Sequence, residues 1–276
     1  MDSPISRPSE EPLSDVSRFL WLGVPLLSLA IVLLAPLMGY KAWDKYFMMS
    51  ADWHSKEFGF IEVVPLFFLA GATVLGVVLF LRRQRLPARV GAVMLLAALA
   101  AFFFLGEECS WGQHYLGYKT PAGMTDLNRQ HEFNLHNNRG AWKTIFSTIP
   151  RLAATVVMCA MAVGPFLLRR RPDLQRVDSP WYWVLPTPAM CLVSAMAALS
   201  TLPAAVINMK SLKPYFPKDA YLSMALSKPS GEFKEYLVAL AMLLYLASVY
   251  TRLRCRIRRE AARAGAADTA EMETPA

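Results

Sequence analysis

The chain has 276 residues, 55% of them hydrophobic, and carries a formal net charge of +8. Its mean hydropathy is +0.30, and apolar runs of about 20 residues are typical of a membrane protein rather than of soluble domains. The positive charge lies mostly in arginine clusters at the ends of these runs. This placement suits anchoring in a membrane, so nucleic acid is not an expected partner. The four cysteines show no CxxC spacing, which predicts neither a disulfide framework nor a zinc knuckle.

Six membrane-spanning helices are predicted, at residues 19–38, 60–81, 90–105, 149–168, 181–207 and 235–249. Each helix would satisfy its own backbone hydrogen bonds, as the hydrocarbon core of a bilayer requires. We expect the third helix to continue into the polar motif that follows it. The predicted fold class is therefore all-α, a polytopic membrane helix bundle formed by residues 18–260.

The segments outside these helices are expected to be loops and tails. Outer loops are predicted at residues 39–59, 106–148 and 208–233. Residues 1–17 are rich in Pro, Ser and acidic residues, and residues 261–276 are rich in alanine. Both segments have little to bury and are expected to be disordered cytoplasmic tails.

Arginine sets the expected orientation, because cytoplasmic loops of membrane proteins are enriched in Lys and Arg. Clusters follow the second, fourth and sixth helices: Arg82, Arg83, Arg85 and Arg89; Arg169, Arg170, Arg171 and Arg176; Arg252, Arg254, Arg256, Arg258 and Arg259. We therefore expect both termini in the cytoplasm. Lysines in the loop 208–233 run against this rule.

The polar residues expected to be costly in a membrane all fall on the other side. They are Asp52, Trp53, His54, Glu57 and Glu62; Glu107 through His114; Asn128, Gln130, Glu132, Asn134, His136 and Asn137; Glu232 and Glu235. The orientation rests on the arginines alone, so this gathering is an independent observation. An ionisable group in or beside hydrocarbon indicates a functional site.

The most concentrated of these groups is Gly106-Glu107-Glu108-Cys109-Ser110-Trp111-Gly112-Gln113-His114, at the end of the third apolar run. If the helix continues, Glu107, Ser110, Trp111 and His114 share one face, and Glu107 and His114 lie about 10 Å apart along the axis. They would then line one groove. The alternative interpretation is that Trp111 is an interfacial anchor and that the two glutamates are solvated residues at a helix end.

A second polar segment covers residues 128–137. Glu132 and His136 share a side in either a strand or a helix, and Glu-xxx-His can supply two ligands to a divalent metal. The alternative is a polar loop whose asparagines cap turns. Among the remaining acids, Glu57, Glu232 and Glu235 fit the first turn of a helix, where the dipole favours them. Glu62 lies one turn deeper.

Three of these motifs together resemble a family of bacterial multi-pass membrane proteins with no established activity. They are Glu57-x-Gly59-x-x-Glu62, the Gly106–Gln113 motif GEExSWGQ, and the segment NxQxExNLHN at residues 128–137. The resemblance covers roughly residues 50–140 and implies a bacterial inner membrane protein with the polar groups facing the periplasm or exterior. It supplies no reaction.

Two groups of membrane hydrolases share shorter fragments. Asp52-Trp53 and Glu57 are similar to a segment of alkaline-ceramidase-like enzymes, which bind zinc through histidines, but this chain has no histidine after His136. Glu107-Glu108 is similar to the start of the glutamate motif of CAAX-processing endopeptidases, but the arginine that follows there is missing.

The first functional hypothesis is a metal-assisted hydrolase or transferase that acts on a lipid or lipid-linked substrate, with membrane lipids as its surroundings. Zinc or another divalent metal would be held by Glu107, Glu132 and His136. Glu108 or Glu62 would act as general base, with Gln113 as a further catalytic residue. Substrate would contact the residues Trp111, His114, Asn128, Gln130, Asn134, Asn137 and Glu57.

Two hypotheses from other classes stay open. In the first, the carboxylates carry protons or bind a cation in a transport or binding protein. In the second, the chain is a non-catalytic membrane scaffold subunit. A polar path from Glu62 to the arginine side would favour transport, since a transporter opens to both faces.

Overall fold

A computed structural model describes residues 16–48, 59–129, 131–168, 170–209, 213–215, 221, 225 and 229–272. These residues form helices and contain no β-strand, which confirms the predicted all-α class. Six helical segments are long and apolar enough to cross a membrane: Phe19–Met38, Phe60–Leu81, Val90–Glu108, Gly140–Leu168, Pro180–Ile207 and Pro229–Gly265. The prediction of six membrane helices is confirmed.

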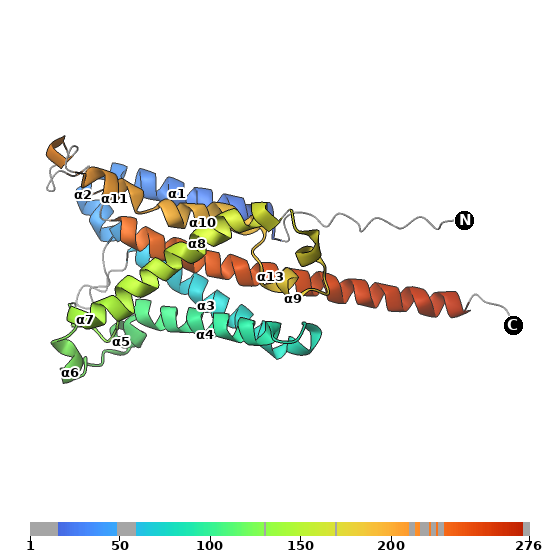
Figure 1. Cartoon of the computed structure of the whole chain (residues 1–276). Coiled ribbons are helices and arrows are strands. Elements are labelled where there is room, and N and C mark those ends of the chain that lie inside the picture. Colours follow the sequence, from blue (N-terminus) through green and yellow to red (C-terminus); the bar gives the residue numbers. More distant parts are fainter. Residues whose placement is uncertain are drawn as a thin grey trace.

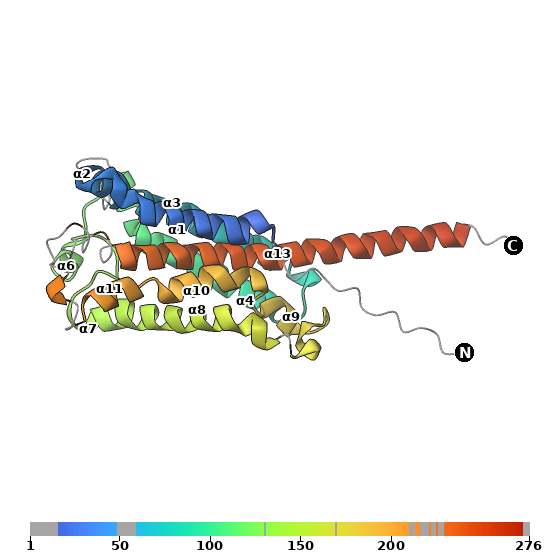
Figure 2. The same cartoon turned by 90° about the horizontal axis from the view of Figure 1, so that it is seen from above.

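The helix α13 (Pro229–Met272) is the central element of the bundle. Of the 18 residues in its most apolar stretch, 61% are buried, whereas the buried share of the corresponding stretch in the other candidate spans is 11% to 39%. It packs against α3 (Phe60–Leu81) and α10 (Cys191–Leu199), while α4 (Val90–Glu108) packs on α3 and α8 (Ile149–Leu168) packs on α10. Figures 1 and 2 show these helices running side by side along one axis, with α1 (Val24–Leu34) on the outside.

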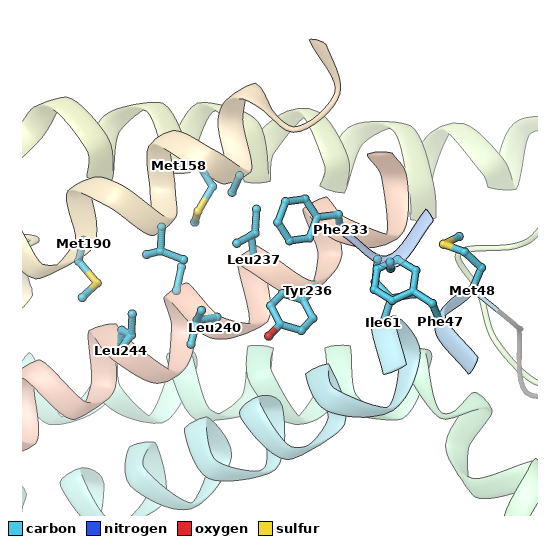
Figure 3. Close-up of a cluster of buried hydrophobic side chains, with 14 of the residues drawn as sticks. Phe47, Met48, Ile61, Met158, Met190, Phe233, Tyr236, Leu237, Leu240 and Leu244 are labelled. Carbon is cyan, nitrogen blue, oxygen red and sulfur yellow. The ribbon is translucent and has the colours of Figure 1, made fainter. Parts of the chain in front are cut away.

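The core lies along α13 and has two parts. Figure 3 shows the first part, in which Phe233, Leu237, Leu240 and Leu244 of α13 meet side chains of α3, α8 and the segment before α3. In the second part, Leu246 and Leu253 of α13 pack with Leu79, Met94 and Trp183. The described core between the two ends of the bundle is therefore built mainly of apolar side chains.

The helices α3 and α4 approach each other closely at Gly76. A Cβ atom placed there would lie 2.6 Å from the Cβ of Ala98 and 3.1 Å from the carbonyl oxygen of Met94. Small residues at helix crossings are typical of membrane bundles, because water-driven burial does not hold helices together in lipid and close packing must do so. This contact fixes the position of the end of α4, where the polar motif begins.

Two of the predicted spans differ from the structure in detail, for identifiable reasons. The fifth span is broken into α9 (Pro180–Val184), α10 and α11 (Leu202–Ile207), because Pro186, Pro188 and Pro203 interrupt helical hydrogen bonding. The fourth span begins earlier than expected, at α7 (Gly140–Lys143), and reaches α8 through a π-helical turn at Thr144–Thr148.

The C-terminal segment also differs from the prediction. The helix α13 continues to Met272, through most of the expected disordered tail at 261–276, because alanine has the highest helix propensity. At 1.5 Å per residue its 44 residues extend about 66 Å, roughly twice the thickness of the hydrocarbon core. In Figure 1 its second half projects beyond the other helices.

The two ends of the bundle carry different residues. The connection from α3 to α4, the connection from α8 to α9 and the second half of α13 lie together at one end, which we call the arginine end (Figure 1). It carries the clusters around Arg82, Arg170 and Arg252. At the other end lie α2 (Tyr40–Trp43), α5 (Gln113–Leu116), α6 (Ala122–Thr125), α7 and α11. We call it the acidic end, after Glu62, Glu107, Glu108, Glu232 and Glu235.

Candidate functional site

The helix α4 ends at Glu108, and the chain then turns sharply through Ser110, Trp111 and Gly112. Their φ angles are 46°, 54° and 85°, so three consecutive residues adopt the left-handed conformation. Glycine adopts it freely, whereas Ser and Trp do so at a cost, which is a feature of functional or tightly packed sites. The turn folds the indole of Trp111 back onto Gly106, where an added Cβ would lie 2.8 Å from ring atoms. The predicted continuous helix through His114, and the shared face derived from it, were therefore wrong.

Glu107 ties the following loop to the end of α4. Its side chain is buried, and Oε1 accepts a hydrogen bond from Nε1 of Trp111 at 2.9 Å. Oε2 accepts hydrogen bonds from the backbone N–H groups of Leu135 at 2.7 Å and His136 at 3.0 Å. The imidazole Nδ1 of His136 lies 3.3 Å from the same oxygen. One buried carboxylate thus fixes a loop 28 residues further along the chain.

A second network, centred on Ser110, lies beside the first. The Ser110 hydroxyl, 1% exposed, donates to Oε2 of Glu132 at 2.8 Å. The amide Nδ2 of Asn134 donates to both Oγ of Ser110 at 3.0 Å and Oε2 of Glu132 at 2.9 Å. Nδ2 of Asn128 donates to the carbonyl and the side-chain oxygen of Asn134, each at 2.8 Å. Because these groups satisfy one another, the network rigidifies the loop.

Gln113 and Tyr118 hold the outer part of the loop. Oε1 of Gln113 accepts a hydrogen bond from the N–H of Phe133 at 2.6 Å, and its Nε2 donates to Thr120 at 2.7 Å. The hydroxyl of Tyr118 donates to the carbonyl groups of Ser110 and Trp111 at 3.2 and 3.1 Å. Desolvation, followed by the nearby Cys109 thiol, raises the pKa of Tyr118, so it acts as a neutral donor.

Within the segment 128–138, the described residues, which leave out Gln130, form neither the strand nor the helix considered above. One isolated antiparallel bridge joins Asn128 to Asn138, and between them the asparagine side chains satisfy the turn. The N–H of Asn137 donates to Oδ1 of Asn134 at 3.4 Å. These contacts agree with the interpretation of the asparagines as turn caps.

A separate group of carboxylates gathers where α3, α4 and α13 meet. The half-buried carboxylate of Glu108 on α4 interacts electrostatically with Glu235 and Glu232 of α13 and with Glu62 of α3. We call these four residues the acid cluster. The opposing charge acting on Glu108 comes from Arg151 at the start of α8, whose Nη2 lies 3.0 Å from Oε1 of Glu235. The neighbouring helices α3 and α4 and the last helix, α13, thus bring their acids to one end of the bundle.

The acid cluster borders the loop that Glu107 fixes. The charge of Glu232 interacts with His136, and that of Glu62 with Tyr115, whose pKa is raised first by burial and then by its neighbours Cys109 and Glu62. Nearby, Nζ of Lys234 donates to Oγ1 of Thr155 on α8. The two polar groupings are therefore adjacent parts of one site.

The predicted metal ligands are divided between the two networks. Glu107 contacts His136, whereas Glu132 contacts Ser110 and Asn134. Within the described part of the chain, no three His, Cys, Asp or Glu side chains lie close enough to hold a metal ion. The residues as arranged do not fit a three-ligand metal centre, and the metal hypothesis stays a prediction.

Some predicted site residues lie outside the described residues: Glu57 and Gln130, with Asp52, Trp53 and His54. The backbone of His114 is in α5, but its side chain is likewise not described. Neither Arg151 nor the linking role of Ser110 was predicted from the sequence. The signal for Arg151 was present, because it is a lone arginine at the start of an apolar run on the side opposite the arginine clusters.

Fold and site together define a polytopic, membrane-type helix bundle with a polar loop and an acid cluster at one end. Comparison with known protein families, curated proteins and solved structures finds no match for this chain.

Proposed function

We propose that the protein is a membrane-embedded binding protein that holds a cationic group at the acid cluster. The observation that carries the proposal is the convergence of Glu62, Glu108, Glu232 and Glu235, all half-buried, from three helices. Like charges at the edge of hydrocarbon repel and are costly to desolvate, so they are retained where they bind a proton, an ion or a charged ligand.

By formal count, the four acids of the cluster outnumber the two cations beside it, Arg151 and Lys234. Arg151 pairs with Glu235, and Lys234 donates to Thr155 and to the carbonyl of Arg151 at the edge of the cluster. Within the described residues, no hydrogen bond or ion pair engages the carboxylate of Glu108, which is therefore the residue that we expect to contact the ligand. A cation at this position would relieve the repulsion felt by all four carboxylates.

The apolar core between the two ends of the bundle favours binding over transport. Buried residues along α13 in this region include Leu237, Leu240, Leu244 and Leu246, and their neighbours on α3 include Leu69 and Leu79. The titratable side chains on α13 in this region are Tyr236, whose hydroxyl hydrogen-bonds with that of Ser28, and Tyr245, which donates to the carbonyl of Val184. We infer that the arginine end faces the cytoplasm, as the positive-inside rule indicates, and that the ligand arrives from the opposite side of a bacterial inner membrane.

A second candidate, the lipid hydrolase or transferase, is favoured by one feature. Glu108 combines an apolar surround with a carboxylate that makes no hydrogen bond among the described residues, which is what a general base requires. A metal-assisted version would need Glu132 to leave Ser110 and join Glu107 and His136. Cation binding needs no such rearrangement.

The test is thermal unfolding of the purified full chain with putrescine, Ca²⁺ or Zn²⁺ as the probe. A ligand that binds only the folded state at 100 times its Kd stabilises it by about 2.7 kcal/mol. We expect at least one probe to raise the Tm of the wild type, and Glu108→Gln to lose most of this shift. The control, Asp173→Asn at the arginine end, should keep it.

The outcomes separate the candidates. If no probe raises the Tm of the wild type, or if Glu108→Gln keeps the full shift, the binding proposal fails. A shift seen with Zn²⁺ alone that is lost in His136→Ala but kept in Glu108→Gln would favour the metal-assisted hydrolase, in which His136 is a ligand and Glu108 is the general base. Elemental analysis of the wild type beside His136→Ala gives an independent check.

A further inference from the structure

A groove lined by arginines lies at the arginine end, on the side of α13. It consists of two adjoining cavities of about 410 and 300 Å³ that share Asp178, Arg256 and Glu260. The connection between α3 and α4 forms one wall with Arg85, and α9 forms another with Tyr182 and Trp183. Arg252, Arg259 and Arg263 complete the lining from α13. We call this the basic groove.

Its charges favour an anion. The lining holds five arginines and two acids, Asp178 and Glu260. Glu260 lies 2.9 Å from Nε of Arg256 and 3.8 Å from Nη1 of Arg85, so one carboxylate bridges two walls of the groove. Arginines outnumber acids in the lining, and a guanidinium fork binds a phosphate through two parallel hydrogen bonds.

One of these arginines is held in place. Arg252 is 6% exposed, and its Nη1 donates to the carbonyl of Tyr182, while its Nε lies 3.4 Å from the carbonyl of Ser248. Its guanidinium lies 5.3 Å from the centre of the Tyr182 ring. A buried, oriented cation makes this groove a built site rather than a cluster of surface charges.

Aromatic and apolar residues at the groove indicate what kind of anion reaches it. Tyr182 and Trp183 line one wall, Trp181 precedes them in α9, and Trp and Tyr are enriched at the level of lipid headgroups. Leu81, the last residue of α3, is 67% exposed and lies three residues before Gln84, which lines the groove. Basic pockets between membrane helices on the cytoplasmic side are known to accept anionic headgroups.

We propose that the basic groove binds the phosphate of an anionic phospholipid from the leaflet at the arginine end. The phosphate would contact Arg256 and Arg259, with Arg252 behind them, and would compete with Glu260 for Arg256. The acyl chains would lie along the apolar surface near Leu81. This site is separate from the acid cluster, which lies at the other end of the bundle.

The test is lipid binding by the full chain in detergent, measured by native mass spectrometry with phosphatidylglycerol and phosphatidylcholine as probes. We expect phosphatidylglycerol to be retained in preference to phosphatidylcholine. The double variant Arg256→Gln/Arg259→Gln should bind phosphatidylglycerol about 25-fold more weakly, since each basic residue near a membrane surface contributes about a factor of five. Glu260→Gln should bind it several-fold more tightly, because a competitor is removed.

The matched control is Arg254→Gln/Arg258→Gln, which removes the same charge from the same part of α13 but does not touch the groove. Two results would overturn the proposal. If both double variants weaken binding equally, the effect is diffuse surface charge. If inorganic phosphate displaces phosphatidylglycerol at equal concentration, the groove binds a soluble anion and the lipid has no role.

Discussion

Replacing Glu107 with alanine is expected to release the loop 128–138 from the bundle and to destabilise the protein by roughly 3 kcal/mol or more. The side chain is buried and accepts hydrogen bonds from Trp111, Leu135 and His136. Hydrogen bonds to a charged group are worth about 1.5–3 kcal/mol each, and the variant leaves their donors without a partner. The Tm should fall, and trypsin should cleave after Arg129 and Arg139 far faster than in the wild type.

Two further variants serve as comparisons for the alanine variant of Glu107. Glu107→Gln has the same shape but loses one acceptor oxygen, so its stability should lie between those of the wild type and the alanine variant. Asp126→Asn alters an exposed acid next to the same loop and should leave both the Tm and the cleavage rate unchanged. An alanine variant with wild-type Tm and protease resistance would show that Glu107 does not anchor the loop.

Reversing the charge of Arg151 is the second change with a large expected effect. Arg151→Glu removes the cation that opposes Glu108 and breaks the contact with Glu235. It also adds a fifth carboxylate beside the other four. Because the arginine is partly exposed, we expect a loss of about 2 kcal/mol rather than the larger cost of a fully buried pair. The loss should be smaller when the probe cation that stabilises the wild type is present.

Exchanging the two charged residues tests whether the contact between Arg151 and Glu235 is responsible for the loss of stability. The double variant Arg151→Glu/Glu235→Arg should regain much of the stability lost by Arg151→Glu, and a double-mutant cycle on Tm measures the coupling. Additive effects of the two substitutions would contradict the contact between α8 and α13.

The arrangement at the acidic end could be predicted in outline from the sequence. Arginine positions alone put Glu62, Glu108, Glu232 and Glu235 on one side, and the structure brings them together there. The common end of these glutamates could be predicted because apolar runs of membrane length determine which loops lie at the same end. This holds however the helices pack against one another.

The internal order of the loop could not be predicted. Its form depends on the left-handed turn at Ser110 and Trp111, and neither residue type favours that conformation. Long-range hydrogen bonds, such as that from Leu135 to Glu107, then choose among conformations that have similar local preferences. As a result, Glu132 and His136, which share a side in either regular structure, end up in different networks.

The length of the last helix was also missed, for a different reason. Residues 261–272 have no apolar face to bury, so they were expected to be unstructured. They continue an already formed helix, and extending a helix costs much less than starting one. The same extension carries Arg263 to the basic groove.

Cross-linking between α4 and α13 tests most directly whether acids from separate helices meet at the end opposite the arginines. In a variant without the native cysteines, Glu108→Cys would be paired with Glu235→Cys, and in a second variant with Arg256→Cys. A short bifunctional thiol reagent should join the first pair and leave the second unjoined. Failure of the first pair to react, while each cysteine alone can be labelled, would mean that the acid cluster does not form.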